Sequence, residues 1–270
     1  MITSQTKKGF VIALISLSFF PFAGCSSEIS SASLQSNEYR TSFTSAEDAE
    51  KTVSTLLGDQ VLRVGGTTRV DYTHLDKGRK SVFETYLGFF QKEPLKEMTK
   101  EEKTATLLNI YHCALLLRVK EVKDKDSTEL PADFLTTQKI HILGVDKSLA
   151  DLRTDILTSS EDVTLPFLIA DGTVGGADFP LGLYTKDTLH SEGARAMKDF
   201  INHPRGVKVD SGNGNIKVAE LFRDNEERFT RDYKSLTVFL EKNLEDARLK
   251  KILAKQNVRD FQNNRTINSL

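Results

Sequence analysis

Cysteine and histidine stand next to each other in this sequence, as Cys113 and His112, and this pair suggests thiol chemistry. A nucleophilic cysteine needs a base within hydrogen-bond reach. The surrounding pattern is helical, however, and adjacent residues on a helix do not face each other. The histidine can therefore activate this cysteine only if the helix is broken. Because Cys113 is followed by an alanine and leucines, we expect a buried, unreactive thiol.

Asn109 and His112 are three residues apart and so share one helix face. With Asp171 or His141 they would make a polar cluster, and we take Asn109, His112 and Asp171 as candidate catalytic residues of an open cleft. The alternative is a buried hydrogen-bond network that fixes the helix in the core, which is favourable only if every polar group is satisfied. The sequence favours the network and leaves the cleft as a hypothesis.

The segment from Asp171 to Asp178 contains three glycines, Gly172, Gly175 and Gly176, directly after an apolar run. It lacks the Gly-Lys-Ser/Thr ending of a phosphate loop, so we interpret it as a tight turn. No spacing in the sequence supports the two aspartates as an acid and base pair. The five histidines have no metal-ligand spacing. The sequence therefore predicts neither a metal site nor a cofactor.

A further candidate for binding is the motif His203-Pro204-Arg205-Gly206, in which Arg205 carries a fixed positive charge. Arg205, together with Tyr111, is a candidate contact for an anion or a partner protein. The motif also has the composition of a helix end followed by a turn into a strand. We favour this structural interpretation, with binding as the alternative.

The N-terminus has the pattern of a bacterial lipoprotein signal. Two lysines precede an apolar run over residues 10–23, and the run ends in Ala23-Gly24-Cys25. The run is shorter than the roughly 20 residues of a transmembrane helix. We expect residues 1–24 to be removed and Cys25 to be acylated, for example with palmitate; an ordinary signal peptide is the alternative. Ser26 favours sorting to the outer membrane, facing the periplasm or the cell surface.

The composition of the chain limits the classes of protein to which it can belong. With 37 basic and 38 acidic side chains, the sequence lacks the charge pattern of a nucleic-acid-binding protein. Once Cys25 is acylated only Cys113 remains, so no internal disulfide forms. The serine-rich residues 25–43 predict a flexible tether, and residues 44–270 predict one folded domain. Expected partners are the membrane, through the anchor, and an envelope protein, peptidoglycan or a small ligand.

Hydrophobic periodicity and capping residues predict that most of the domain is helical. Three helices begin at the capping pairs Thr44/Glu47, Thr99/Glu102 and Ser148/Asp151. Further helices are expected around residues 82–90, 186–202, 229–240 and 244–254. Strands are expected at residues 61–64 and 163–170, and as a hairpin at 207–209 and 216–218. This order predicts an α+β fold, in which a helix-rich single domain packs on a small, largely antiparallel sheet.

Six segments of the chain, in order, resemble the DUF547 family, a family of domains of unknown function. They are Val70-Asp71-Tyr72, residues 109–114, residues 144–156, Ala194-Arg195 with residues 201–207, residues 216–222 and Ile267-Asn268. The resemblance covers about residue 68 to the C-terminus. It implies a compact α+β domain, compared with the papain and transglutaminase class, and it implies no established reaction.

Polar positions of the family pattern are replaced in this chain. The family has histidine, asparagine and cysteines after its central strand, whereas residues 166–180 contain none of these. His112 stands where the family has asparagine, Arg153 where it has glutamate, and Asn263-Asn264-Arg265 where it has Tyr-Asp-Trp. The resemblance thus implies a lost or altered catalytic centre. We expect a non-catalytic binding or scaffold module; the alternative is a papain- or transglutaminase-like hydrolase or acyltransferase with an altered centre.

Overall fold

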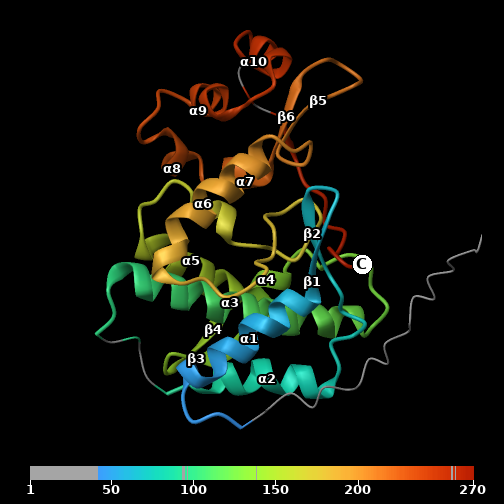
Figure 1. Cartoon of the computed structure of the whole chain (residues 1–270). Helices are drawn as coiled ribbons and strands as arrows, with labels where there is room; N and C mark the ends of the chain where they lie inside the picture. The colour runs from blue at the N-terminus through green and yellow to red at the C-terminus, as the bar shows by residue number, and fades with distance from the viewer. Residues whose placement is uncertain (1–41, 93–94, 96, 138, 257, 259) are drawn as a thin grey trace, which may run out of the picture. The chain divides into compact units, whose positions relative to one another are not determined.

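The computed structural model describes residues 42–270, apart from residues 93–94, 96, 138, 257 and 259 (Figure 1). The expected signal peptide, the acylated Cys25 and the tether up to residue 41 lie outside the described residues. The chain divides into two units, residues 1–37 and 38–270, and the description below concerns the second. In its described part, no helix combines the length and the apolar character needed to cross a bilayer.

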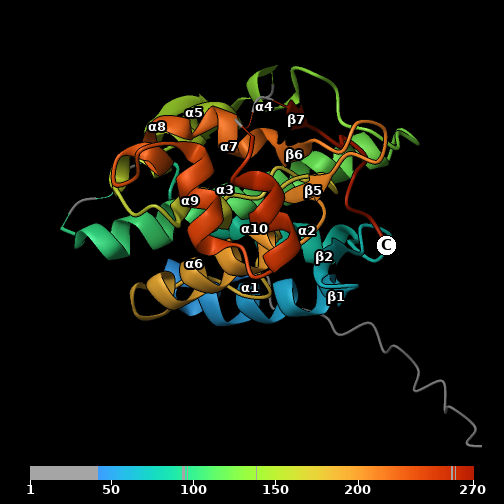
Figure 2. The same cartoon turned by 90° about the horizontal axis from the view of Figure 1, so that it is seen from above.

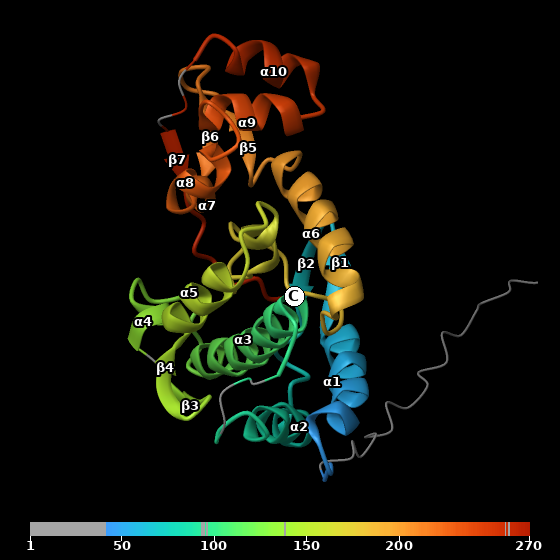
Figure 3. The same cartoon turned by 90° about the vertical axis from the view of Figure 1, so that its left-hand side faces the viewer.

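The core is organised around one long helix, α3 (Lys100–Lys123). It begins with the predicted capping box: the Thr99 hydroxyl accepts the Glu102 N–H at 3.2 Å, and the Glu102 carboxylate accepts the Thr99 N–H at 2.9 Å. Every residue from Leu107 to Leu117 is buried. A helix that is buried on all sides must be surrounded by other elements. Here α2 (Lys77–Gly88), α5 (Leu149–Ser159) and α6 (Lys186–Ile201) all contact it (Figure 3).

The first helix, α1 (Ala46–Gln60), packs on α2 and begins at a different cap from the one predicted. Ser45, not Thr44, is the N-cap, and its hydroxyl accepts the Asp48 N–H at 3.1 Å. Asp48 in turn accepts the Thr44 N–H at 3.0 Å. Both Thr44/Glu47 and Ser45/Asp48 have capping spacing, so the spacing alone does not distinguish between them.

The α+β prediction is confirmed, and in the described part of the chain the strands divide among three small sheets. Two are antiparallel hairpins, and the third is a three-stranded sheet in which β6 pairs antiparallel with β5 and parallel with β7. The strands are β1 (Val61–Val64) with β2 (Thr67–Val70), β3 (Lys139–Ile142) with β4 (Val145–Ser148), and β5 (Val207–Val209), β6 (Ile216–Ala219) and β7 (Asp260–Gln262). The predicted strand at residues 61–64 and the predicted hairpin are present; β2, β3, β4 and β7 were not predicted.

Residues 163–170 are buried as expected, but the prediction of a strand there is wrong. They contain η1 (Leu165–Leu168), a 3-10 helix with Pro166 near its start. Asp162 accepts both the N–H and the hydroxyl of Thr164 at 2.8 Å, which starts the turn. Proline lacks an N–H and has a fixed φ, so it suits the first turn of a helix and not a central strand.

A second hydrophobic cluster lies in the C-terminal part. Phe167 of η1 contacts Phe200, Phe222 and Phe229, with ring centroids 5.4 to 5.9 Å apart. The helices that bury these rings include α7 (Glu220–Asp224), α8 (Glu226–Thr230), α9 (Leu236–Asn243) and α10 (Ala247–Leu253). Figure 2 shows α9 and α10 side by side. The prediction of one helix over residues 229–240 is wrong, because Ser235 caps a new helix by accepting the Val238 N–H at 3.3 Å.

Residues 262–270 run from the C-terminal cluster back to the first hairpin (Figure 1). Thr266 bridges Glu129, Ile267 bridges Thr173, and Ser269 bridges Val70. The C-terminal segment thereby connects three parts of the chain that are distant in sequence. It also forms one wall of the candidate site described below.

Candidate functional site

Asn109 does not face a cleft. Its side-chain amide donates to the Tyr184 carbonyl at 2.9 Å, and its side-chain oxygen accepts the Tyr184 N–H at 2.8 Å. The side chain therefore pairs with the backbone as a neighbouring strand would. With both polar groups used and only 4% of the residue exposed, Asn109 holds the segment before α6 against α3.

His112 is fully buried, so the hypothesis that it occupies an open cleft is wrong. Its Nδ1 lies 2.7 Å from the Leu108 carbonyl, which assigns the proton to this nitrogen, and Nε2 accepts the Ala170 N–H at 3.3 Å. Burial lowers the pKa of His112 to about 4, and the hydrogen bond to Leu108 only partly opposes this. The imidazole is therefore neutral at neutral pH, and it belongs to the buried network that was the alternative.

Two further residues of α3 are also closed to solvent. Cys113 is a free, fully buried thiol, and burial raises its pKa well above the usual range. It is the unreactive thiol expected from the sequence. Tyr111 donates its hydroxyl to the Ala170 carbonyl at 2.5 Å and is also fully buried, so its proposed contact with a partner at the surface is wrong.

Arg205 is engaged inside the protein. Its guanidinium forms two parallel bonds to Asp178, at 2.8 and 2.7 Å, and donates to the Gly176 carbonyl at 3.1 Å. The side chain is 8% exposed and stacks over the Phe200 ring. Burial favours the neutral acid, but the hydrogen bonds and charge of Arg205 outweigh it and hold the pKa of Asp178 below its usual range. These contacts support the structural interpretation of Arg205.

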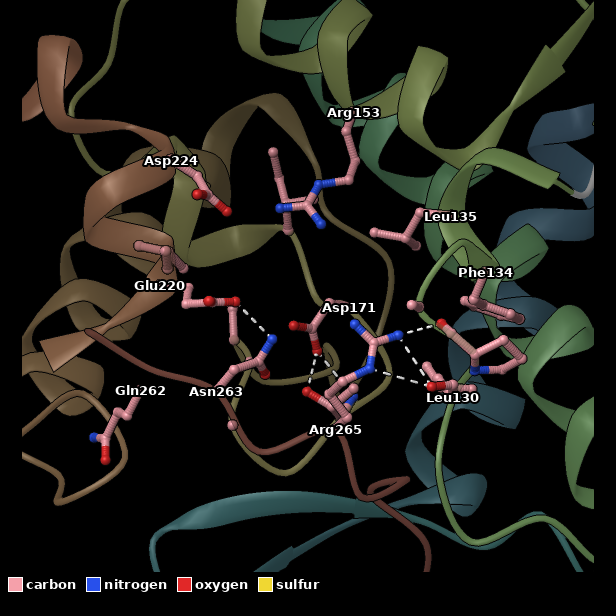
Figure 4. A pocket seen from close by; sticks show the side chains of 18 residues that line it. Leu130, Phe134, Leu135, Arg153, Asp171, Glu220, Asp224, Gln262, Asn263 and Arg265 are labelled. Atoms are coloured by element: carbon pink, nitrogen blue, oxygen red, sulfur yellow. Dashed lines mark hydrogen bonds between the residues drawn. The ribbon is translucent and has the colours of Figure 1, made fainter. Parts of the chain in front are cut away.

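Asp171 is the one candidate catalytic residue that opens onto a cavity, which has a volume of about 190 Å³ (Figure 4). Its Oδ1 accepts the Thr173 N–H at 2.8 Å and the Thr173 hydroxyl at 2.7 Å. The carboxylate packs directly on Gly176, where a Cβ would lie 1.9 Å from Oδ1. Only glycine leaves room for the aspartate here, so the glycine-rich segment fixes the carboxylate at the cavity wall.

Arg153 reaches into the same cavity from α5 (Figure 4). No carboxylate oxygen of a described residue lies within 4.0 Å of its guanidinium nitrogens. Burial raises the pKa of the Tyr111 phenol below the cavity, and the nearby Arg153 guanidinium partly opposes this effect. Arg153 is thus a half-buried cation that faces the cavity without an ion pair from the described part of the chain.

The opposite walls come from α7 and the C-terminal segment. Glu220 and Asp224 both contact Arg223, at 3.2 and 3.0 Å, and Glu220 also accepts a hydrogen bond of 2.6 Å from Asn263. Arg265 donates to the carbonyls of Leu130 and Pro131, so it holds the loop that closes the cavity on the side of α4 (Phe134–Thr137).

The cavity brings together four polar residues that lie far apart in the sequence. Arg153, Asp171, Asn263 and Arg265 all line it, although they are spread over more than a hundred residues of sequence. His112 does not line the cavity, but it accepts the N–H of Ala170, the residue before Asp171. Glu220 and Asp224 were not singled out from the sequence, and nothing in their spacing connects them to the other residues.

A larger, open hollow of about 710 Å³ lies beyond residues 262–265 and is lined by basic side chains. Two of these are already neutralised: Arg205 by Asp178, and Lys217 by Asp210 at 2.8 Å. We take the smaller cavity, onto which both Arg153 and Asp171 open, as the candidate site. In the described part of the chain, no three His, Cys, Asp or Glu side chains are placed to hold a metal ion.

The charged side chains that line the cavity can recognise a charged ligand. None of the described side chains that line it is a cysteine, a histidine or a serine. Its one hydroxyl, on Thr173, belongs to a local turn with Asp171. Activation of a nucleophile requires a base that a third group orients, and no such set is present among the described lining residues.

Comparison with known proteins agrees with the resemblance of the sequence. Residues 95–201 match the model of a family described as "Protein of unknown function, DUF547". No curated protein and no solved structure matches the chain. The matched segment contains α3, α5 and α6, with Asn109, His112, Arg153 and Asp171, whereas α7 and the C-terminal wall of the cavity lie outside it. This segment of the chain is therefore similar to the DUF547 family.

Proposed function

We propose that this protein is a lipid-anchored, non-catalytic binding domain of the bacterial cell envelope, with a small polar ligand in the cavity between α5 and α7. The observation that carries this proposal is the Arg153 guanidinium. It faces the cavity without a carboxylate partner among the described residues. Partly buried charges are normally paired, so an unpaired one at a cavity favours an anionic group of a ligand.

The contacts of the buried residues favour binding over catalysis. Asn109 and His112 use their polar groups on the backbone of Tyr184, Leu108 and Ala170. They are therefore not available to a substrate. No observation favours the hydrolase or acyltransferase alternative.

The size of the cavity favours a small ligand over a macromolecule. A volume of about 190 Å³ is below the roughly 300–1,000 Å³ of pockets for drug-sized ligands. The lining combines apolar side chains such as Ile169 and Leu221 with a few charged groups, which is typical of a site for a compact polar molecule. Peptidoglycan or an envelope protein would require a more extended contact surface.

The sequence around Cys25 supports the lipid anchor. We expect a clickable palmitate analogue, supplied to bacteria that express the full chain, to label the protein and the Cys113→Ala variant equally. The Cys25→Ala variant should remain unlabelled. Equal labelling of the Cys25→Ala variant would contradict the anchor and leave the binding proposal to be tested by itself.

Ligand binding is tested with the full chain in detergent micelles and a library of small polar compounds, by ligand-observed NMR. Ala132 is an exposed residue at the cavity wall, so Ala132→Trp should block the site with little effect on packing. Thr137→Trp, at an exposed position that does not line the cavity, is the matched control. We expect compounds that bind the control and not Ala132→Trp, and that are recovered chemically unchanged. Binding that Ala132→Trp leaves intact would contradict the proposed site.

A further inference from the structure

Two side chains of opposite charge face the cavity without forming an ion pair with each other. Arg153 comes from α5, and Asp171 comes from the segment after η1 (Figure 4). Both side chains line the same cavity. Their charged atoms are nevertheless more than 4.0 Å apart, since no ion pair joins them. Neither group forms an ion pair with a described residue.

The carboxylate of Asp171 has one oxygen available. Oδ1 accepts two hydrogen bonds from Thr173, and Oδ2 accepts none from the described residues. Packing on Gly176 prevents the side chain from turning away. Glu220 and Asp224 are engaged by Arg223 and, for Glu220, by Asn263. Among the acidic residues of the cavity, Asp171 is therefore the best placed to accept hydrogen bonds from a cation.

Arg153 supplies the complementary group. A guanidinium presents parallel N–H donors that match the two oxygens of a carboxylate. Ile169, Leu135 and Leu221 line the rest of the cavity and provide apolar contact. The small volume of the cavity requires that the two charges of a ligand lie close together in the molecule.

From this arrangement we infer that the cavity binds a small zwitterion of the α-amino acid type, with its carboxylate on Arg153 and its ammonium group on Asp171. The inference rests on the proposed function, since it names the ligand class of the same cavity. A single molecule of this kind forms an ion pair with each of the two side chains, whereas a simple anion or a simple cation pairs with only one of them.

Three small probes of similar size test the inference on the unmodified full chain in micelles, by isothermal titration calorimetry. L-Alanine carries both charges, L-lactate replaces the ammonium group with a hydroxyl, and L-alaninamide replaces the carboxylate with an amide. We expect alanine to bind at least tenfold more tightly than either of the others. Each charge-assisted contact that is lost should weaken binding by about this factor.

A variant of Arg153 tests its assignment to the carboxylate of the ligand. Arg153→Gln should weaken alanine and lactate and leave alaninamide unchanged. Arg118→Gln, which removes a comparable half-buried arginine that pairs with Glu121 away from the cavity, should change none of the three. Alanine binding that Arg153→Gln does not weaken would overturn the assignment.

The results separate this inference from the proposed function. Lactate or alaninamide binding as tightly as alanine would overturn the zwitterion inference and leave a cavity that binds one charge. Absence of binding by all three probes would also overturn it, whereas the Ala132→Trp comparison tests the proposed cavity with other compounds.

Discussion

Asp178 and Arg205 are joined by two parallel hydrogen bonds, of 2.8 and 2.7 Å, and their side chains are only 19% and 8% exposed. Asp178 also accepts the N–H and the hydroxyl of Thr68, at 2.8 and 3.1 Å. The pair therefore connects β2, the segment before α6 and the turn before β5. Because it also orders the chain next to Gly176, it stabilises the wall of the cavity from behind.

Arg205→Ala should destabilise the protein strongly, because it leaves the Asp178 carboxylate buried without its partner. Breaking such a pair costs about 3–5 kcal/mol of unfolding free energy. Arg195→Ala removes an exposed arginine that contacts Glu192 and Asp199, and it should cost less than about 1 kcal/mol. Urea unfolding of both variants measures the difference. Equal losses in the two would show that the buried pair has no special role.

The buried imidazole of His112 predicts a pH dependence of stability. Its pKa is lowered to about 4 in the folded protein, whereas an unfolded histidine titrates near 6.5. Between these values the unfolded chain binds the additional proton, so stability is highest above pH ~6.5 and falls as the pH is lowered toward 4. The shift corresponds to about 3 kcal/mol.

Urea unfolding at a series of pH values measures this dependence. His112→Gln retains a donor and an acceptor but does not titrate, so its stability should change less over the same interval. His190→Gln removes a histidine whose side chain is 87% exposed and should keep the dependence of the original protein. A dependence that His112→Gln leaves unchanged would assign it to other groups.

Cys113 should be protected from thiol reagents as long as the protein is folded. The residue is fully buried, and burial raises its pKa, so little thiolate forms and none is accessible. Maleimide labelling of the acylated protein should therefore be slow in buffer and fast in denaturant. Thr137→Cys, at an exposed position, should be labelled rapidly in both conditions. Fast labelling of Cys113 in the folded protein would contradict the packing of α3.

The elements that could be predicted from the sequence are those fixed by local contacts. The caps at Thr99 and Ser148 depend on residues three positions apart, and the structure has both. The prediction of a strand at 163–170 was wrong because an apolar run is equally compatible with other buried conformations. Pro166 favours the 3-10 helix that is present there. The strand β7 was not predicted, because its partner β6 lies some forty residues away in the sequence.

The candidate site likewise depends on contacts between residues that are far apart in the sequence. Asn109 and His112 were correctly placed on one helix, but their polar groups are used by backbone segments far along the chain. Asp171 is a candidate from the sequence, and Arg153 is a residue at which the sequence differs from the family that it resembles. Both residues share a cavity with Glu220 and Arg265 because the C-terminal segment runs back to the first hairpin. No pattern of neighbouring residues in the sequence predicts this path.

Gly176→Ala should disturb the cavity directly. A Cβ at this position would lie 1.9 Å from Oδ1 of Asp171, so the carboxylate must move from the wall that Gly176 now allows it to occupy. Forcing an extra methyl group into such a contact costs about 1–3 kcal/mol. Thermal unfolding and calorimetry with L-alanine should show lower stability together with weaker binding.

Gly88→Ala provides the matched control for this substitution. Gly88 lies in the last turn of α2, and a Cβ there would meet no atom within 4 Å. Alanine is favoured over glycine in a helix by about 0.5–1 kcal/mol, so this variant should be as stable as the original protein or slightly more stable, with unchanged binding. If Gly176→Ala behaved in the same way, the position of Asp171 would not depend on Gly176, and the argument that fixes the carboxylate at the cavity wall would fail.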